Sequence, residues 1–331
     1  MYLPMAVIAA CATLFFSLVI LLRLVFKKYR NNYQFVFHFF GSLASATFVF
    51  LAGGWAYISF WLRWVFLVLY LAGCVYMFIK RSRATAGKKG IGKWYYIVPR
   101  LAFTLVMCLA VFAFLSGRFY QGKAVDLKFP FKKGSYYIMQ GGASRLTNPA
   151  HRNFSLSKYG FAMDISKLYQ SGNRADGISP THVEDYAIYG DTVFSPCAGK
   201  ILLVRDSINN NKPGHTNTRF VHGNHIIIQC KGYRVFMAHF IKNKILVAEG
   251  QVVSEGTPLG LVGNSGFSAE PHLHLCVYKE YDTHPYSEHD TINARNERHI
   301  NPAYDDYRYS GVSSPFTLDG NFYMMNDIIK K

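Results

Sequence analysis

The first 125 residues of this 331-residue chain contain no aspartate and no glutamate, although they carry 14 lysines and arginines. All 19 acidic residues lie between residues 126 and 331, where 22 basic residues leave a net charge of only +3. The overall charge of +17 is therefore concentrated in the N-terminal part. This distribution argues against a basic surface that binds nucleic acid.

The N-terminal stretch without acidic residues contains four long apolar segments. Each has close to the ~20 residues that a helix needs to cross a bilayer, and the segments run over 3–26, 35–56, 58–79 and 96–116. A cleaved signal peptide accounts for at most the first segment, which lacks a basic start. Four such runs without an acidic residue are hard to place in a water-soluble fold. We therefore predict an all-α membrane region of four transmembrane helices over residues 1–117.

The links between these segments predict an orientation in the membrane. Lysines and arginines crowd the first and third links, whereas the second link, "GGWAYIS", has no charge. Because basic links stay cytoplasmic, the N-terminus and everything after the fourth segment are predicted to lie outside. Arg63 in the third segment weakly opposes the pattern, and we expect it to reach the outer interface beside two tryptophans.

The chain also lacks any Cys-x-x-Cys pair, which makes a cysteine zinc knuckle a poor interpretation. Three of the six cysteines lie in the apolar segments, where a cysteine acts as a small apolar residue. The other three allow one disulfide, but the sequence does not select the pair; these are Cys197, Cys230 and Cys276.

No long amphipathic helix is predicted between residues 136 and 278. The segments there are short, rich in β-branched and aromatic residues, and separated by glycine, asparagine and proline, which is typical of an antiparallel sheet. We predict a linker over 118–134, a mainly-β domain over 135–281 and a C-terminal extension over 282–331. Mostly loops are expected in the polar tail that begins at Lys279.

One hairpin is predicted in detail, in "NHIIIQCKGYRVFMAHF". Lys231 and Gly232 separate two alternating runs, which is a signal for a two-residue turn. Alternation then places Val235, Met237 and His239 on one face of the returning strand.

Four side chains in this region are candidates for metal binding or catalysis. His272 and His274 lie two residues apart in "PHLHLCVY" and so share one face of a strand. His239 ends another strand, and Asp164 is an acid in the otherwise apolar "YGFAMDIS", where a carboxylate is costly unless it is paired or bound to a cation. Imidazole and carboxylate are ligands that zinc prefers, and a catalytic zinc keeps three protein ligands and one open position. Each signal is weak alone, because a lone strand histidine is more often structural.

The surrounding residues resemble the lysostaphin-type, or LytM-type, zinc metallopeptidases of peptidase family M23. "GLVGNSGFSAEPHLHLCVY" resembles the closing motif of that family, "GxVGNSGxSxxPHLHxxV", and "AHF" resembles its "AHL". "VFSPCAGKILLV", "GNHIII" and "EGQVVSEGTPLG" resemble further family segments, in the right order over 159–278. The resemblance implies an antiparallel β-sheet of the lysostaphin-like (duplicated hybrid motif) type and an endopeptidase that cleaves peptide bonds of bacterial peptidoglycan.

The resemblance also implies roles for individual residues. Asp164 and His274 match the positions of two zinc ligands, and His239 and His272 match the positions of two histidines that assist catalysis. Two neighbouring imidazoles on one face cannot point equally well at one ion, so one ligates while the other reaches the reacting groups. One catalytic histidine is then expected to act as general base and the other to stabilise the oxyanion.

The sequence departs from the family at the first motif, HxxxD, where Gly160 replaces the histidine. We propose His151, the nearest upstream histidine, as the third zinc ligand, with His182 as the next candidate. If neither serves, the site is incomplete and the domain binds without cutting. The remaining histidines are interpreted as interface, loop or surface residues: His38, His215, His222, His225, His284, His289 and His299. Of these, either His222 or His225 could line the cleft.

Three functions are weighed. The leading hypothesis is a zinc endopeptidase held in the cytoplasmic membrane of a bacterium, with its domain on the periplasmic or extracellular side and peptidoglycan or a peptide as substrate. The alternative is a domain that binds peptidoglycan or regulates another cell-wall hydrolase without catalysis. A transporter or sensor built on the spans is disfavoured because the spans contain no acidic residue, although they leave room for a partner protein in the membrane.

Overall fold

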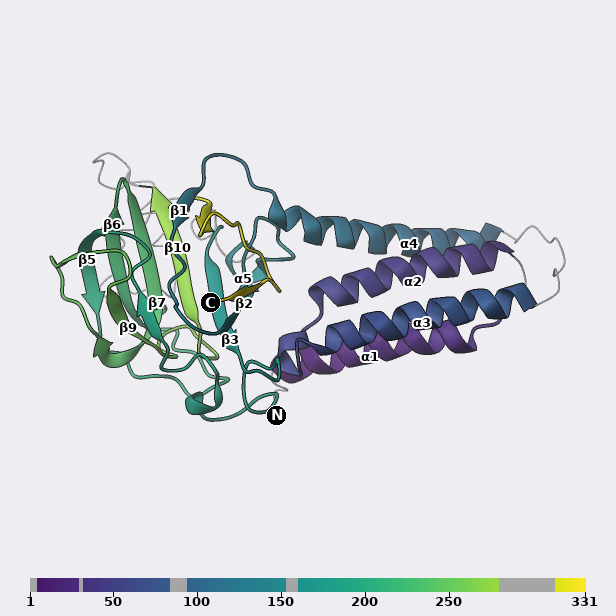
Figure 1. Cartoon of the computed structure of the whole chain (residues 1–331), viewed down its shortest axis with the longest axis horizontal. Helices are drawn as coiled ribbons and strands as arrows, with labels where there is room; N and C mark the ends of the chain where they lie inside the picture. Colours follow the sequence, from purple (N-terminus) through teal and green to yellow (C-terminus); the bar gives the residue numbers. More distant parts are fainter. Residues whose placement is uncertain (1–4, 30–31, 84–93, 153–159, 280–312) are drawn as a thin grey trace. The chain divides into compact units, whose positions relative to one another are not determined.

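Two compact units make up the computed structural model of the chain, which describes residues 5–29, 32–83, 94–152, 160–279 and 313–331 (Figure 1). The first unit consists of Met1–Ser116 with Ser171–Asn173, and the second of Gly117–Gln170 with Arg174–Lys331. The finer domain bounds that we drew from the sequence stay a prediction.

Among its described residues, the first unit contains four helices that are long and apolar enough to cross a membrane, as predicted. They are α1 (Met5–Phe26), α2 (Asn32–Ala52), α3 (Leu62–Arg83) and α4 (Trp94–Leu115). The short helix η1 (Trp55–Tyr57) lies in the uncharged second link. Many large apolar side chains are exposed on these helices, among them Val68, Leu105 and Phe112. Such surfaces are disfavoured in water and suit a lipid environment.

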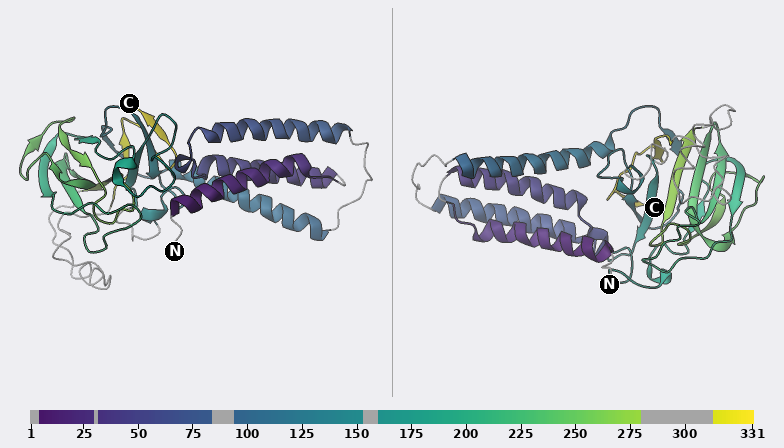
Figure 2. Two further views of the ribbon diagram at one scale, coloured as in Figure 1. Left: turned by 90° about the horizontal axis from the view of Figure 1, so that it is seen from below. Right: turned by 180° about the vertical axis from the view of Figure 1, so that it is seen from behind.

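The second unit is built on an antiparallel sheet of ten strands, which confirms the predicted fold class (Figures 1 and 2). The strand order is β12-β2-β3-β10-β7-β6-β5-β8, with β9 paired to β7 and β4 paired to β9. A separate parallel pair joins β1 and β11. The strands are β1 (Val125–Leu127), β2 (Ser135–Gln140), β3 (Met163–Leu168), β4 (Thr192–Phe194), β5 (Gly199–Arg205), β6 (Asn224–Cys230), β7 (Tyr233–Ile245), β8 (Val252–Val253), β9 (Pro258–Val262), β10 (Leu273–Lys279), β11 (Phe316–Leu318) and β12 (Ile328–Lys330).

The predicted hairpin joins β6 and β7. Cys230 pairs with Tyr233, and the two residues between them have positive φ, 26° at Lys231 and 79° at Gly232. Positive φ at both positions is what a type I′ turn requires, and its twist matches that of the flanking strands.

The two faces of the sheet differ in chemistry. Leu273 and Leu275 of β10 pack in the main apolar core together with Ile165 of β3. Because side chains alternate along a strand, His274 and Cys276 point to the opposite face. That face carries the candidate site.

The C-terminal tail takes part in the sheet more than the sequence indicated. Among its described residues, β11 pairs with β1 and β12 adds to β2 at the edge of the large sheet. Arg118 also donates to the carboxylate of Asp327. Hydropathy did not reveal these short strands because each has only three residues, too few to establish a period.

The sequence did not select which cysteines pair. In the structure a disulfide joins Cys197 and Cys230, which are 33 residues apart, and Cys276 is a free, buried thiol.

Replacing Cys197 by alanine is expected to lower the free energy of unfolding by about 3–4 kcal/mol, because the cross-link no longer restricts the unfolded chain. Denaturant unfolding of the full-length protein in detergent, followed by near-ultraviolet circular dichroism, measures the change. Wild type and variant should become equal under reducing conditions. Alkylation of Cys197 in the untreated protein would contradict the pairing.

Candidate metal centre

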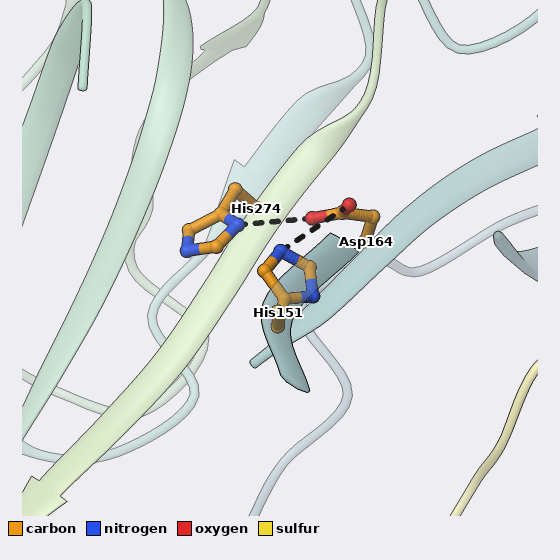
Figure 3. A group of neighbouring side chains, drawn as sticks. All are labelled: His151, Asp164 and His274. Carbon is orange, nitrogen blue, oxygen red and sulfur yellow. Dashed lines mark hydrogen bonds and ion pairs between the residues drawn. The ribbon is translucent and has the colours of Figure 1, made fainter. Parts of the chain in front are cut away.

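Three side chains from distant parts of the chain converge on one point of the sheet (Figure 3). His151 belongs to the helical turn α5 (Pro149–Arg152), Asp164 to β3 and His274 to β10. The Nδ1–H group of His274 donates to Asp164 Oδ1 at 2.9 Å, and His151 Nε2 lies 3.5 Å from Asp164 Oδ2. One candidate ligand atom from each residue lies within 4.8 Å of the others.

Strand pairing explains two of these positions. His274 is directly opposite Asp164 in the antiparallel ladder between β10 and β3. Residues directly opposite each other project to the same face with Cβ atoms ~5 Å apart. The two neighbouring strands therefore bring the carboxylate and the imidazole together, whereas His151 reaches the same point from outside the sheet.

A buried asparagine orients His151. The Nδ1–H group of His151 donates to Asn148 Oδ1 at 2.6 Å, which directs Nε2 toward Asp164. Asn148 is fully buried, and its own amide donates to the Ala162 carbonyl at 2.9 Å. A metal-binding histidine commonly donates its other ring nitrogen in this way, which fixes the tautomer and the ring orientation.

Replacing Asn148 by alanine is expected to weaken zinc binding by about 10- to 100-fold, because the His151 ring loses the acceptor that orients it. Competition with a zinc-binding dye measures the affinity of the full-length protein. An Asn148→Asp variant keeps an acceptor at the same place and should retain more of the affinity. Equal affinity of the alanine variant and wild type would show that Asn148 does not orient a ligand.

Burial and charge set the protonation of the three groups, whose side chains are each 11% exposed. Burial lowers the pKa of His151 to about 4, although Asp164 acts in the opposite direction. Burial alone would raise the pKa of Asp164, but the imidazoles of His151, His272 and His274 outweigh it and hold that pKa below its ordinary value. A neutral His151 and an ionised Asp164 are the forms that bind a cation.

These shifts predict a pH dependence for the metal-free protein. His151 and His239 have folded-state pKa values below the ~6.5 of an unfolded histidine, so below pH 6.5 the unfolded chain binds more protons. Stability is therefore expected to fall as the pH drops from about 6.5 to 4. Asp164 adds a further loss only below its unfolded pKa. Thermal unfolding of the chelator-treated protein checks this, and a His151→Asn variant should show a weaker dependence in this window.

The donor set fits zinc. Two imidazole nitrogens and one carboxylate oxygen are ligands of catalytic zinc sites, which leave one position open. Two atoms that each bind at about 2.0–2.2 Å can lie at most about 4.4 Å apart. His274 Nδ1 lies 2.9 Å from Asp164 Oδ1, and His151 Nε2 lies 3.5 Å from Asp164 Oδ2. Each pair satisfies this limit, and Nδ1 of His274 would bind zinc in place of the proton that it donates to Asp164.

His272 lies beside the three candidate ligands, and its tautomer is directed by the backbone. Its Nδ1–H group donates to the Glu270 carbonyl at 2.8 Å, and its Nε2 lies 3.6 Å from Asp164 Oδ1. The side chain of Ser268 also approaches Nδ1, at 3.2 Å. The free lone pair of a neutral His272 therefore points toward the candidate metal centre.

His239 also faces the centre, but by a route that simple alternation does not predict. We expected it on the face of Val235 and Met237, which pack in the main apolar core. Its ring centroid instead lies 4.7 Å from that of His272 and 5.8 Å from that of His274, on the opposite face. The expectation of a shared face was wrong for His239.

A bulge in β7 causes the difference. His225 pairs with Ala238 and Asn224 pairs with Phe240, so His239 is an extra residue in its strand. Its φ of 73° lies in the left-handed region. Bulges re-aim side chains and are common beside active sites. The Nδ1–H group of His239 then donates to the Ser265 carbonyl at 2.7 Å, and burial lowers its pKa well below the ordinary value.

The other histidine candidates take different places. His182 is exposed in the loop before the short helix η3 (Val183–Asp185) and is outside the group. The rings of His222 and His225 contact Phe236, whose own ring lies 5.8 Å from that of His274. Three further histidines lie outside the described residues: His284, His289 and His299.

Asn148 was missed by the sequence reasoning, although a signal for it was present. It precedes Pro149, and an asparagine followed by proline marks the start of a helix. A short helical turn here would have suggested that Asn148 and His151 lie on the same side, three residues apart.

Comparison with known proteins identifies the family that part of this domain matches. The family model described as Peptidase family M23 matches residues 183–302. The family resemblance drawn from the motifs is therefore confirmed. The matched segment contains His239, His272 and His274, whereas His151 and Asp164 precede it.

Individual relatives are distant. The Peptidoglycan DD-endopeptidase ShyA of Vibrio cholerae serotype O1 is 27% identical over 157 residues, or 47% of this chain and 33% of ShyA. The chain thus spans about a third of the length of this curated relative. A zinc containing peptidase from Vibrio cholerae is 24% identical over 49% of this chain and 40% of the other, with a TM-score of 0.28. The catalytic domain of lysostaphin from Staphylococcus simulans is 20% identical over 46% of this chain and 84% of that domain, with a TM-score of 0.25.

Proposed function

We propose that this domain of Peptidase family M23 is a zinc endopeptidase that hydrolyses peptide bonds of peptidoglycan. The proposal rests on one observation: His151, Asp164 and His274 converge on a point that His239 and His272 also face. A structural role for so many imidazoles around one ionised carboxylate is a poor explanation, because burying them costs free energy without adding apolar packing.

His151, Asp164 and His274 are the residues that would hold the zinc ion. When bound, zinc supplies a Lewis acid that polarises the scissile carbonyl and makes water acidic enough to attack near neutral pH. The two imidazole ligands are held in place by Asn148 and by the strand β10, respectively. The low pKa of Asp164 keeps its carboxylate charged throughout the physiological range.

His239 and His272 would divide the proton transfer and the charge stabilisation. Each donates its Nδ1–H group to a backbone carbonyl, which leaves Nε2 as the atom that faces the centre. A neutral imidazole in this tautomer accepts a proton at Nε2 and so acts as general base toward the attacking water. The same proton is then available to the leaving amine. The second imidazole would stabilise the oxyanion in its protonated form, in which Nε2 also carries a proton and donates it in a hydrogen bond.

The membrane location is also part of the proposal. Four helices of sufficient length precede the domain, and the basic links support a location of the domain outside the cytoplasmic membrane. Bacterial peptidoglycan lies on that side of the membrane, and the printed name of ShyA describes a peptidoglycan endopeptidase. Both observations support peptidoglycan as the substrate.

The decisive experiment uses the full-length protein in detergent. Zinc content is measured by mass spectrometry, and release of soluble fragments from purified peptidoglycan is followed with His274→Ala as the control. The expected result is one zinc per chain and fragment release that the variant lacks. If the wild type binds zinc but releases no more fragments than His274→Ala, the proposal fails.

A domain that binds peptidoglycan without cutting it is the second candidate. The replacement of the family histidine by Gly160 favoured it. The position of His151, 3.5 Å from Asp164, weakens this reason because it offers a third ligand. Co-sedimentation with peptidoglycan in the absence of fragment release would favour the second candidate.

A further inference from the structure

An ion pair between a buried arginine and a partly buried glutamate lies next to the candidate site and belongs to none of the motif positions. Arg174 is 1% exposed. Its guanidinium donates to the carboxylate of Glu270, with Nε 2.9 Å and 3.1 Å from the two oxygens and Nη2 2.5 Å from Oε2. Fork geometry of this kind fixes the orientation of a carboxylate as well as its position.

Arg174 is itself rigidly held. Its Nη1 donates to the Ile178 carbonyl at 3.2 Å, and its guanidinium lies 5.5 Å from the centre of the Tyr186 ring. Its carbonyl accepts the backbone N–H of Ala187 at 3.0 Å. The guanidinium therefore provides a fixed point rather than a mobile surface charge.

Glu270 connects this fixed point to His272. The carbonyl of Glu270 accepts the Nδ1–H group of His272 at 2.8 Å. Both residues lie in the turn before β10, which starts at Leu273, so no strand hydrogen bonds of β10 fix the Glu270 peptide plane. The Arg174 fork holds the Glu270 carboxylate instead, and the hydroxyl of Ser268 donates to the Glu270 carbonyl at 2.9 Å.

We propose that Arg174 is a positioning residue for the reaction: by clamping the Glu270 side chain, it aims the Glu270 carbonyl at His272 Nδ1. This carbonyl then holds His272 in the tautomer whose Nε2 faces the metal centre. The proposal rests on the proposed function, because it assumes that His272 acts in peptide hydrolysis. It concerns the direction of one hydrogen bond and is independent of the overall stability of the fold.

Three variants of the full-length protein in detergent separate positioning from stability. Arg174→Met removes the fork. The double variant Arg174→Met, Glu270→Met replaces the pair by apolar side chains of similar size, an exchange that often leaves stability intact. Lys167→Met is the matched control, because it removes an ion pair of 2.9 Å with Asp191 in the same unit without contact to His272.

Four readouts are needed for each variant: zinc content, melting temperature, kcat and KM for peptidoglycan fragments, and the nitrogen-15 signals of the His272 ring. Arg174→Met is expected to lower kcat by roughly 100-fold, as expected for a misplaced catalytic group, with zinc content unchanged. The double variant should recover the melting temperature but not kcat. In both, the His272 ring should shift from a single Nδ1–H tautomer to a mixture, whereas Lys167→Met keeps wild-type kcat and tautomer.

Two results would overturn the inference. One is a double variant with wild-type kcat, since the ion pair would then serve only packing. The other is an unchanged Nδ1–H tautomer of His272 in both Arg174 variants. The ring signals are read without substrate, so they test the positioning even if the wild-type protein cleaves nothing and the proposed function fails.

Discussion

Replacing His151 by alanine is expected to weaken zinc binding by more than about 100-fold, the upper end of what the loss of an orienting partner costs, and to abolish fragment release. Two ligands would remain, and a catalytic zinc site requires three from the protein. Asp164 would also lose one of the imidazoles that hold its pKa down. Dialysis of the full-length protein against a competing chelator, followed by metal analysis, measures the retained zinc.

His182→Ala is the control for this experiment. His182 was the other candidate for the third ligand, and it is exposed in a loop apart from the converging residues. We expect it to retain zinc and activity at the wild-type level. Retention of zinc in His151→Ala together with its loss in His182→Ala would reverse the assignment.

Replacing His239 or His272 by alanine is expected to lower kcat by about 10²- to 10⁴-fold while zinc stays bound. This range is typical for the loss of a general acid or base. Zinc binding should persist because neither side chain belongs to the group of His151, Asp164 and His274. Fragment release at saturating substrate and zinc content after gel filtration are the two measurements.

The double variant of His239 and His272 provides a sharper result. Residues that act as one unit lose less together than the sum of their separate losses, and their rings lie 4.7 Å apart. We expect the double variant to be only slightly slower than the slower single variant. His215→Ala, at an exposed loop position, is the surface control. Loss of zinc in the His272 variant would make His272 a ligand and exclude the proposed division of roles.

Much of the site follows from local sequence patterns. The two-residue spacing of His272 and His274 determines a shared face, because side chains alternate along any regular strand. The same alternation failed for His239, because a bulge adds one residue to β7 and turns the side chain to the other face. A bulge depends on how two strands pair across the sheet, and the local pattern of "FMAHF" does not predict it.

The sequence alone determined the four apolar helices, the antiparallel sheet and the residue types of the site, because length, hydropathy and alternation act over a few residues. Only the tertiary structure decided which side chains meet. Register placed Asp164 opposite His274, Asn148 turned His151 toward them, and the fold brought Cys197 beside Cys230 and Arg174 beside Glu270. These contacts join residues far apart in the chain or depend on a local turn, and their geometry is set by the packing of the whole domain.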